Sequence, residues 1–172
     1  MKKASFTLIE ILVGLVILSI LATLGIPQYQ NFIEQGRAKA CAVNLDTLQR
    51  ALDIYVMEHD AIPASLDDLA KGNLQLISCP KDDTSPIKVQ GGRSYALSSA
   101  LVGLSAQQYK ALPPDTVLIG DCEATVLSTA SNLAERHKLG GDDRGMTVSK
   151  NHKVCERSQE DVSCIKEMSE LY

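Results

Sequence analysis

The feature that most constrains the fold is an apolar run near the N-terminus. Residues Phe6–Ile26 are 21 positions with a single charged side chain, Glu10. As an α-helix rising about 1.5 Å per residue, this run is roughly 32 Å long, which matches the hydrocarbon core of a bilayer. Lys2 and Lys3 precede the run, and no comparable basic cluster follows it closely. The positive-inside rule therefore predicts a cytoplasmic N-terminus, and Pro27 is expected to kink the helix near the membrane exit.

Three interpretations of this apolar run differ in how they explain the carboxylate of Glu10. A plain anchor accounts for the length but not for Glu10. A cleaved secretory signal fits the short basic start, but the run is long for one and no small-x-small cleavage site precedes Pro27. A third interpretation is a cut after Ser5, which gives Phe6 a charged amine. In a helical stack, this amine would pair with the Glu10 carboxylate of a neighbouring subunit and offset its desolvation. The simplest alternative is that Glu10 snorkels to the cytoplasmic interface.

The chain beyond this run has the pattern of an amphipathic helical half followed by a small head. Apolar residues recur three and four apart up to about His59, so the helix is expected to lay one face on a globular body. After Gly72, turn residues punctuate short apolar runs, as in strands joined by loops. The predicted fold is therefore α+β, with one long helix packed on a small antiparallel sheet. The helical stripe comprises Ala38, Cys41, Leu45, Leu48, Leu52 and Tyr55.

Several short elements are predicted within the head. Ser65 and Asp68 have capping-box spacing for a short helix, and a Ser cap is expected to start another helix over residues 105–112. Lys150-Asn151 is expected to form a tight hairpin turn, because Asn tolerates positive φ. The expected strands are Ser94–Ser98, Thr116–Gly120, Gly145–Ser149 and His152–Cys155.

Composition argues against a nucleic-acid partner and offers little for catalysis. The net charge is -4, acids and bases are interspersed, and there is no Trp, so neither a phosphate-binding patch nor a stacking platform is expected.

His137 and His152 with Asp142 or Asp143 suggest a metal or hydrolytic site, but solvated loop residues explain them more simply. No nucleophile elbow, HExxH or Gly-rich phosphate loop accompanies them. We therefore expect neither enzymatic activity nor a cofactor.

The order of residues at the N-terminus resembles a known signal. A short basic leader, the segment Phe6-Thr7-Leu8-Ile9-Glu10 and an apolar run ending at Pro27 are similar to the class III signal of type IV pilins and type II secretion pseudopilins. The resemblance implies that a prepilin peptidase cuts between Ser5 and Phe6 and methylates the new Phe6 amine. It also implies the register role of Glu10 described above. Ser5 departs from the pattern, since the family nearly always has Gly there.

The resemblance further implies an organisation and a location. Residues 1–5 are a leader peptide, 6–26 the transmembrane and filament-core helix, 27–60 its amphipathic continuation, and 61–172 the globular head. Such a subunit first resides in the bacterial inner membrane, spanning it once with its N-terminus in the cytoplasm. An inner-membrane assembly platform then adds it to a homo-oligomeric helical filament, periplasmic or on the cell surface. The implied function is that of a structural subunit of a type IV pilus-like filament or a type II secretion pseudopilus.

The cysteines allow several pairings. Many type IV pilins close a C-terminal loop with a disulfide, and the resemblance points to Cys155 with Cys164 for this bond. Cys79 with Cys122 is a further pairing, which leaves Cys41 as a buried thiol, and Cys41 with Cys79 is the alternative. Sequence does not fix the connectivity.

Two alternatives complete the candidate residues. Some major pseudopilins carry a calcium loop in the C-terminal part of the head, so Asp142 and Asp143 are candidate calcium ligands, although no run of spaced oxygen ligands accompanies them. A function of a different class is a membrane-anchored periplasmic enzyme or binding protein that is not polymerised. Its site would comprise His137, Asp142 and His152.

Overall fold

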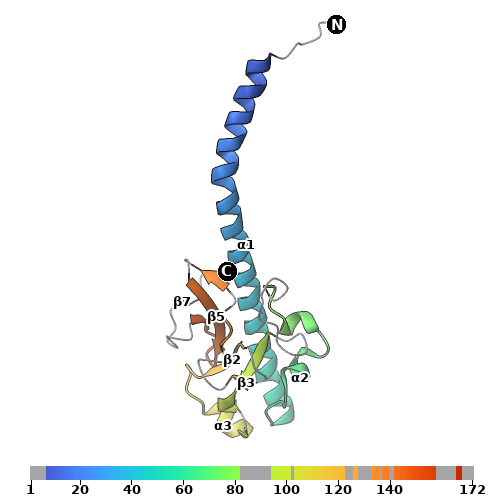
Figure 1. Ribbon diagram of the computed structural model, residues 1–172. Coiled ribbons are helices and arrows are strands. Elements are labelled where there is room, and N and C mark those ends of the chain that lie inside the picture. Colours follow the sequence, from blue (N-terminus) through green and yellow to red (C-terminus); the bar gives the residue numbers. More distant parts are fainter. Residues whose placement is uncertain are drawn as a thin grey trace. The chain divides into compact units, whose positions relative to one another are not determined.

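The computed structural model describes residues 7–81, 94–101, 103–122, 126–127, 133–135, 137–139, 142–157 and 166–167. The chain divides into two compact units, Met1–Gln35 and Gly36–Tyr172. Helix α1 (Leu8–His59) contributes to both units (Figure 1). The predicted cleavage point between Ser5 and Phe6 lies outside the described residues.

In the first unit, α1 is apolar and satisfies its hydroxyl groups internally. The Ser19 hydroxyl donates to the Val16 carbonyl at 2.7 Å, and the Thr23 hydroxyl donates to the Ser19 carbonyl at 2.8 Å. Neither hydroxyl therefore needs a partner outside the helix. The helix continues through Pro27, which has no N–H to donate to the preceding turn. The expected kink at Pro27 stays a prediction.

In the second unit, α1 buries one face along the predicted stripe. The prediction is right: the first five stripe residues are buried, and Tyr55 is partly buried and packs against the core. The Tyr55 ring also stacks on the His59 ring, with centroids 4.2 Å apart. Val56, four residues after Leu52, is a further buried position. The buried residues of α1 are Ala38, Cys41, Ala42, Leu45, Leu48, Gln49, Leu52 and Val56.

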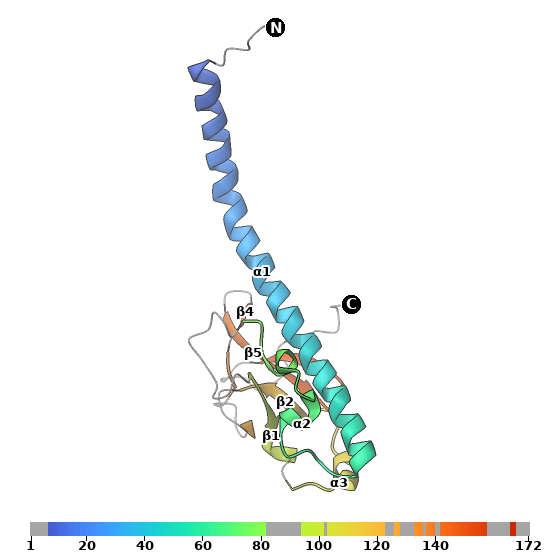
Figure 2. The ribbon, with the colours of Figure 1, turned by 90° about the vertical axis from the view of Figure 1, so that its right-hand side faces the viewer.

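The head contains the predicted antiparallel sheet, which in Figure 2 lies beside the second half of α1. The strand order is β3-β1-β2-β5-β6-β7, with β4 paired to β5, and the one parallel pair among the described strands is β1 with β3. All four predicted strands are present, but β5 begins three residues earlier than expected and β6 two residues later. The strands are β1 (Tyr95–Ser98), β2 (Val117–Asp121), β3 (Val126–Leu127), β4 (His137–Leu139), β5 (Asp142–Ser149), β6 (Val154–Arg157) and β7 (Lys166–Glu167).

Short helices lie between α1 and β1 and between β1 and β2, and both predicted ones are present. Helix α2 (Leu66–Ala70) begins after Ser65, whose N–H donates to the Asp68 carboxylate at 3.0 Å. Helix α3 (Ala106–Lys110) is capped by Ser105 and ends two residues earlier than predicted. The Gln108 N–H donates to the Ser105 hydroxyl at 3.3 Å, and the Ser105 N–H donates to the Gln108 side chain at 2.9 Å. Two 3₁₀ helices, η1 (Leu74–Ile77) and η3 (Ser99–Leu101), complete the connections.

Strands β5 and β6 form the predicted hairpin, but the positive φ is not at Asn151. It lies at His152, with φ of 60°. The Ser149 N–H donates to the Lys153 carbonyl and the His152 N–H donates to the Ser149 carbonyl, both at 3.0 Å. The Asn151 side-chain oxygen instead accepts from the Ser149 hydroxyl and the Lys153 N–H. The loop is therefore one residue longer than a two-residue turn, and its left-handed residue comes last.

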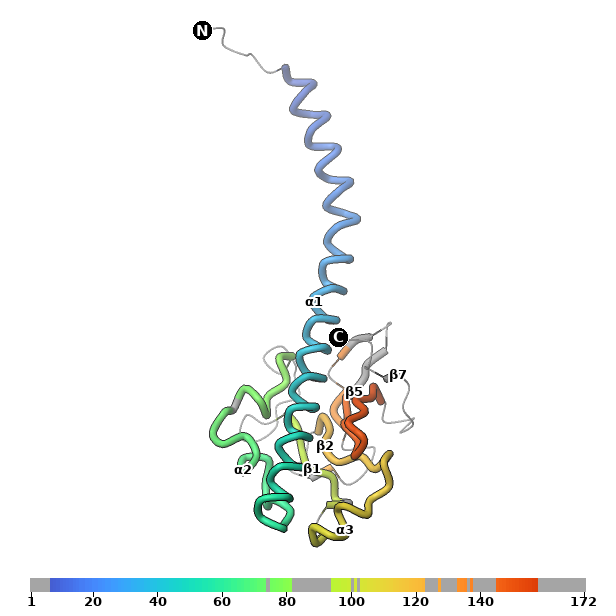
Figure 3. The backbone as a smooth tube through the Cα atoms, turned by 180° about the vertical axis from the view of Figure 1, so that it is seen from behind, coloured from blue at the N-terminus to red at the C-terminus, as the bar shows by residue number. Residues whose placement is uncertain are grey.

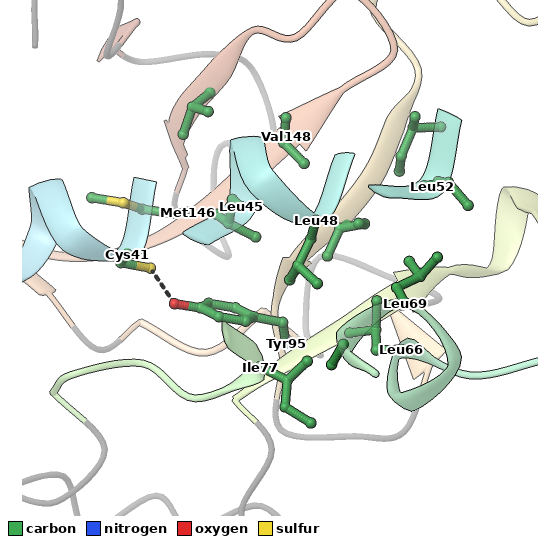
Figure 4. Packing of buried hydrophobic residues seen from close by; sticks show 14 of the residues in the cluster. Cys41, Leu45, Leu48, Leu52, Leu66, Leu69, Ile77, Tyr95, Met146 and Val148 are labelled. Atoms are coloured by element: carbon green, nitrogen blue, oxygen red, sulfur yellow. Dashed lines mark hydrogen bonds between the residues drawn. The ribbon is translucent and has the colours of Figure 1, made fainter. Parts of the chain in front are cut away.

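The main core of the head lies between α1 and the sheet. Figure 4 shows Leu45, Leu48 and Leu52 of α1 beside Leu69 of α2 and Val148 of β5. In Figure 3, seen from behind, α2 and β5 lie on different sides of α1. A second, smaller cluster comprises Ala96, Cys122 and Leu127.

Candidate functional site: the first half of helix α1 and a buried thiol cluster

The first half of α1 exposes its large apolar side chains. Leu8 is 83% exposed and Phe32 is 69% exposed. The exposed positions are nearly consecutive, so at 100° per residue they cover every side of the helix. They are Leu8, Ile9, Ile11, Leu12, Val13, Leu15, Val16, Ile17, Leu18, Ile20, Leu21, Leu24, Ile26, Tyr29, Phe32 and Ile33.

Such a surface is not stable in water. Burying one large apolar side chain contributes about 1.5–3 kcal/mol, so these residues together favour an apolar environment strongly. Within the described residues, α1 is long and apolar enough to cross a membrane, by length and composition. The core helix of a soluble protein would be mostly buried, whereas the apolar part of α1 is exposed. Lipid or other chains around it would remove this surface from water.

Glu10 lies in the first turn of α1, at the same end as the predicted new N-terminus. Its side chain is exposed, and its N–H donates to the Thr7 carbonyl at 3.1 Å. A carboxylate in the first turn interacts favourably with the helix dipole. Its predicted partner, the amine of Phe6, lies outside the described residues, so the pairing stays a prediction.

In the head, His137 and His152 do not form one site. His137 in β4 pairs with Arg144 of β5, whereas His152 follows Ser149 at the other end of β5. At about 3.3 Å per residue, these two points of β5 are roughly 16 Å apart. The solvated-loop interpretation fits His152, which is exposed and lies 3.2 Å from the Asp53 carboxylate. It is wrong for His137, which is fully buried.

His137 instead belongs to a buried group of polar side chains, the thiol cluster, with Cys41, Cys79, Asp121 and Tyr95. The Cys79 sulfur lies 3.3 Å from Nε2 of His137, and that nitrogen lies 3.8 Å from Oδ2 of Asp121. The Cys41 thiol donates to the same Oδ2 at 3.7 Å. The Tyr95 hydroxyl donates to the Cys41 sulfur at 3.2 Å, as the dashed line in Figure 4 shows. All five side chains are at most 3% exposed.

The contacts within the thiol cluster change the acidity of its members. The hydrogen bond from Cys41 lowers the pKa of Cys79 to about 5, although burial opposes this, and His137 adds to the effect. Burial raises the pKa of Cys41. Burial disfavours the charged form of His137, but its contacts with Cys79 and Asp121 outweigh burial and raise its pKa. The arrangement therefore favours a thiolate beside an imidazolium, in a place that an external substrate does not reach.

Sequence reasoning brought Cys41 and Cys79 together only as an alternative disulfide and did not place His137 with them, and it missed Asp121 and Tyr95. Asp121 was hidden because it ends an apolar strand, where its carboxylate accepts the Met146 N–H at 3.1 Å. The only sign in the sequence of a polar site there was an acidic residue at the end of an apolar strand.

The remaining predicted residues are tested only in part. Cys155 is in a disulfide, while its predicted partner, Cys164, lies outside the described residues. Cys41, Cys79 and Cys122 are buried thiols, so the pairing of Cys79 with Cys122 and the alternative pairing of Cys41 with Cys79 are both wrong. Cys41 is the buried thiol that was expected. The side chains of the calcium candidates, Asp142 and Asp143, also lie outside the described residues.

Residues 1–26 match the family described as the prokaryotic N-terminal methylation motif. Competence protein ComGC of Halalkalibacterium halodurans is 29% identical over 104 residues, which are 60% of this chain and 92% of that protein. Type II secretion system core protein G of Pseudomonas aeruginosa is 35% identical over 68 residues, which are 40% of this chain and 48% of that protein.

Prepilin peptidase-dependent protein A of Clostridium perfringens is 33% identical over 93 residues, or 52% of this chain and 65% of that protein. The chain thus spans most of the ComGC protein but about half of the protein G relative. No solved structure matches the chain.

Proposed function

We propose, for a chain that belongs to the type IV pilin and pseudopilin family, the function of a structural subunit in a type IV pilus-like filament or a type II secretion pseudopilus. The observation that carries this proposal is the first half of α1, which exposes large apolar side chains on every side. Lipid covers this surface before assembly, and the same segments of neighbouring subunits cover it afterwards. The printed names of the relatives, a competence protein and a type II secretion core protein, support a role in such machinery.

The proposed route begins in the bacterial inner membrane, with the N-terminus in the cytoplasm. A prepilin peptidase cuts between Ser5 and Phe6 and methylates the Phe6 amine. The inner-membrane assembly platform then moves the subunit from lipid into the periplasmic or surface filament. Because lipid tails and packed apolar helices are similarly apolar, this transfer has little hydrophobic cost, and specificity must come from polar groups.

Glu10 is the polar group that sets the register. Once the surrounding helices exclude water, its carboxylate is stable only next to a positive charge, which the Phe6 amine of a neighbouring subunit supplies. An unprocessed subunit lacks that amine, so its Glu10 stays unpaired and its assembly is disfavoured.

Intact mass and N-terminal sequencing of the protein from its native membrane test the processing step. A mature chain that begins at Phe6 and carries one methyl group is expected. A chain that still begins at Met1 would overturn the processing step and leave the anchored, unpolymerised protein as the better description.

Assembly is tested by the fraction of protein that enters sheared filaments. Glu10→Gln removes the charge at constant shape, and loss of one partner of a buried pair costs about 3–5 kcal/mol, so incorporation should fall at least about tenfold. Glu58→Gln, at the exposed end of α1, is the matched control and should assemble normally. Equal incorporation of both variants would refute the register role of Glu10.

A further inference from the structure

Three segments that are far apart in the sequence bring metal-ligating side chains to one buried point of the head. Cys41 comes from α1, Cys79 follows η1 and His137 begins β4. The ligand atoms of Cys41, Cys79 and His137 all lie within 4.8 Å of one another. The function proposed above uses the apolar half of α1 and Glu10, and it does not explain why these side chains lie together in the head.

The separations fit a tetrahedral metal ion. Zinc binds sulfur at about 2.3 Å and nitrogen or oxygen at about 2.0–2.1 Å, so neighbouring ligand atoms lie roughly 3.3–3.8 Å apart in a tetrahedron. The Cys79 sulfur lies 3.3 Å from Nε2 of His137, and the ligand atoms of Cys41, Cys79 and His137 all lie within 4.8 Å of one another. An ion among these three atoms requires only that they draw closer together. Asp121 lies beside this group, 3.7 Å from the Cys41 sulfur and 3.8 Å from Nε2 of His137.

The donor set selects the kind of ion. Two sulfurs and one imidazole suit zinc, whereas calcium prefers six or more oxygen ligands. The imidazole presents Nε2 to the cluster, while Nδ1 of His137 has no hydrogen-bond partner within the described residues. Contacts within the cluster, rather than a bond at Nδ1, therefore hold the ring where it lies.

Burial gives the energetic reason for an ion at this point. Cys41, Cys79 and His137 are at most 3% exposed, and polar side chains in such a place are costly unless they are paired. A disulfide between Cys41 and Cys79 would not use His137. A divalent cation engages both sulfurs and the imidazole at once.

We propose that Cys41, Cys79 and His137 are the protein ligands of a structural zinc site, which joins the second half of α1 to the sheet of the head and whose fourth ligand atom is an oxygen. Tyr95 is a positioning residue, because its hydroxyl holds the Cys41 sulfur from outside the ligand set. The proposal rests on the head alone and does not depend on filament assembly.

The full chain, purified in detergent, is loaded with zinc, passed into metal-free buffer and analysed for bound metal. About one zinc per chain is expected for the natural sequence and none for Cys79→Ser. Cys122→Ser is the matched control, because Cys122 is also a fully buried thiol but packs in the smaller cluster with Ala96 and Leu127. It should keep its zinc.

Three results would overturn the proposal: no zinc retained by the natural chain, equal zinc in Cys79→Ser, or a Cys41–Cys79 disulfide in the mass spectrum of unreduced peptides. A second measurement needs no variant, and so does not depend on whether Cys79→Ser folds. X-ray absorption of the zinc-loaded natural chain should show two sulfur neighbours at about 2.3 Å and two nitrogen or oxygen neighbours at about 2.0–2.1 Å. An all-oxygen shell would mean adventitious surface binding and would also overturn it.

Discussion

The carboxylate of Asp53 joins three segments of the head, and its removal should destabilise the fold measurably. Its Oδ1 accepts from the Tyr109 hydroxyl at 2.7 Å and from the Lys150 ammonium at 3.0 Å. Its Oδ2 accepts from the Gln49 amide at 3.3 Å and lies 3.2 Å from Nε2 of His152. Asp53 thus links α1 to α3 and to the loop between β5 and β6.

The cost of Asp53→Ala follows from these contacts. Tyr109 is 1% exposed, so its hydroxyl loses a charge-assisted bond without gaining water, at about 1.5–3 kcal/mol. The Lys150 pair is partly exposed, with side chains 20% and 23% accessible, so it contributes only about 0.5–1 kcal/mol. The free energy of unfolding should therefore fall by about 2–4 kcal/mol. Adding Tyr109→Phe should cost little more, because both changes remove the same bond.

Urea unfolding of the full chain in detergent measures this loss, with near-ultraviolet circular dichroism of the tyrosines as the signal. With a urea dependence of about 2 kcal/mol per molar, the middle of the usual range, the midpoint should fall by roughly 1–2 M. Glu58→Ala, an exposed acidic position of the same helix, is the control and should leave the midpoint unchanged. If Asp53→Ala and Glu58→Ala have the same midpoint, the reasoning is refuted.

The stability that Asp53 contributes should also depend on pH. Burial disfavours the charge on Asp53, but the Tyr109 hydrogen bond and the Lys150 charge outweigh it and lower the pKa of Asp53. A carboxyl group whose pKa is lower in the folded state stabilises the fold above its unfolded value of about 3.9, and this contribution is lost as pH falls through the lower folded value. The stability difference between the natural chain and Asp53→Asn should therefore be full near pH 5 and shrink below about pH 4. A difference that grows in acid would contradict the assignment.

Two further changes test the packing of the head. Leu48→Ala should lower the free energy of unfolding by about 3–5 kcal/mol, because Leu48 is fully buried. Ile54→Ala, at an exposed position of the same helix, is the control and should change the free energy of unfolding by no more than about 0.5 kcal/mol. Equal urea midpoints for the two variants would contradict this prediction. Gly145→Ala should cost about 1–3 kcal/mol, since its added Cβ would lie 2.7 Å from both the Leu133 side chain and the Ala134 carbonyl. A urea midpoint unchanged by Gly145→Ala would show that β5 moves aside freely.

The long helix was predictable because its signals are local and repeated. The buried stripe recurs every three or four residues, and a periodic pattern of that length specifies a helix and its buried face together. The pattern did not include Val56, which is buried beside the partly buried Tyr55. How deeply each of these two side chains is buried depends on the surface that the head packs against the helix, which the helix pattern does not contain.

The thiol cluster was not predictable for the opposite reason. Cys41, Cys79 and His137 have no regular spacing, and strand pairing decides that β4 lies beside β5 and brings His137 inward. In the hairpin loop, the residue with positive φ was also not predicted correctly from the sequence. It is His152 rather than Asn151, because the Asn151 side chain accepts hydrogen bonds from Ser149 and Lys153.

The two halves of α1 separate assembly from folding. Every residue of the core clusters within the described part of the chain lies at Ala38 or beyond, whereas the exposed apolar surface of α1 is concentrated before Gly36. The head therefore completes its core without any side chain from residues 7–35. Exchange of lipid for neighbouring helices around that first half leaves the contacts of the core unchanged. Under the function proposed above, the subunit enters the filament already folded, and the proposed selectivity of assembly rests on the few polar groups of its apolar helix, above all Glu10.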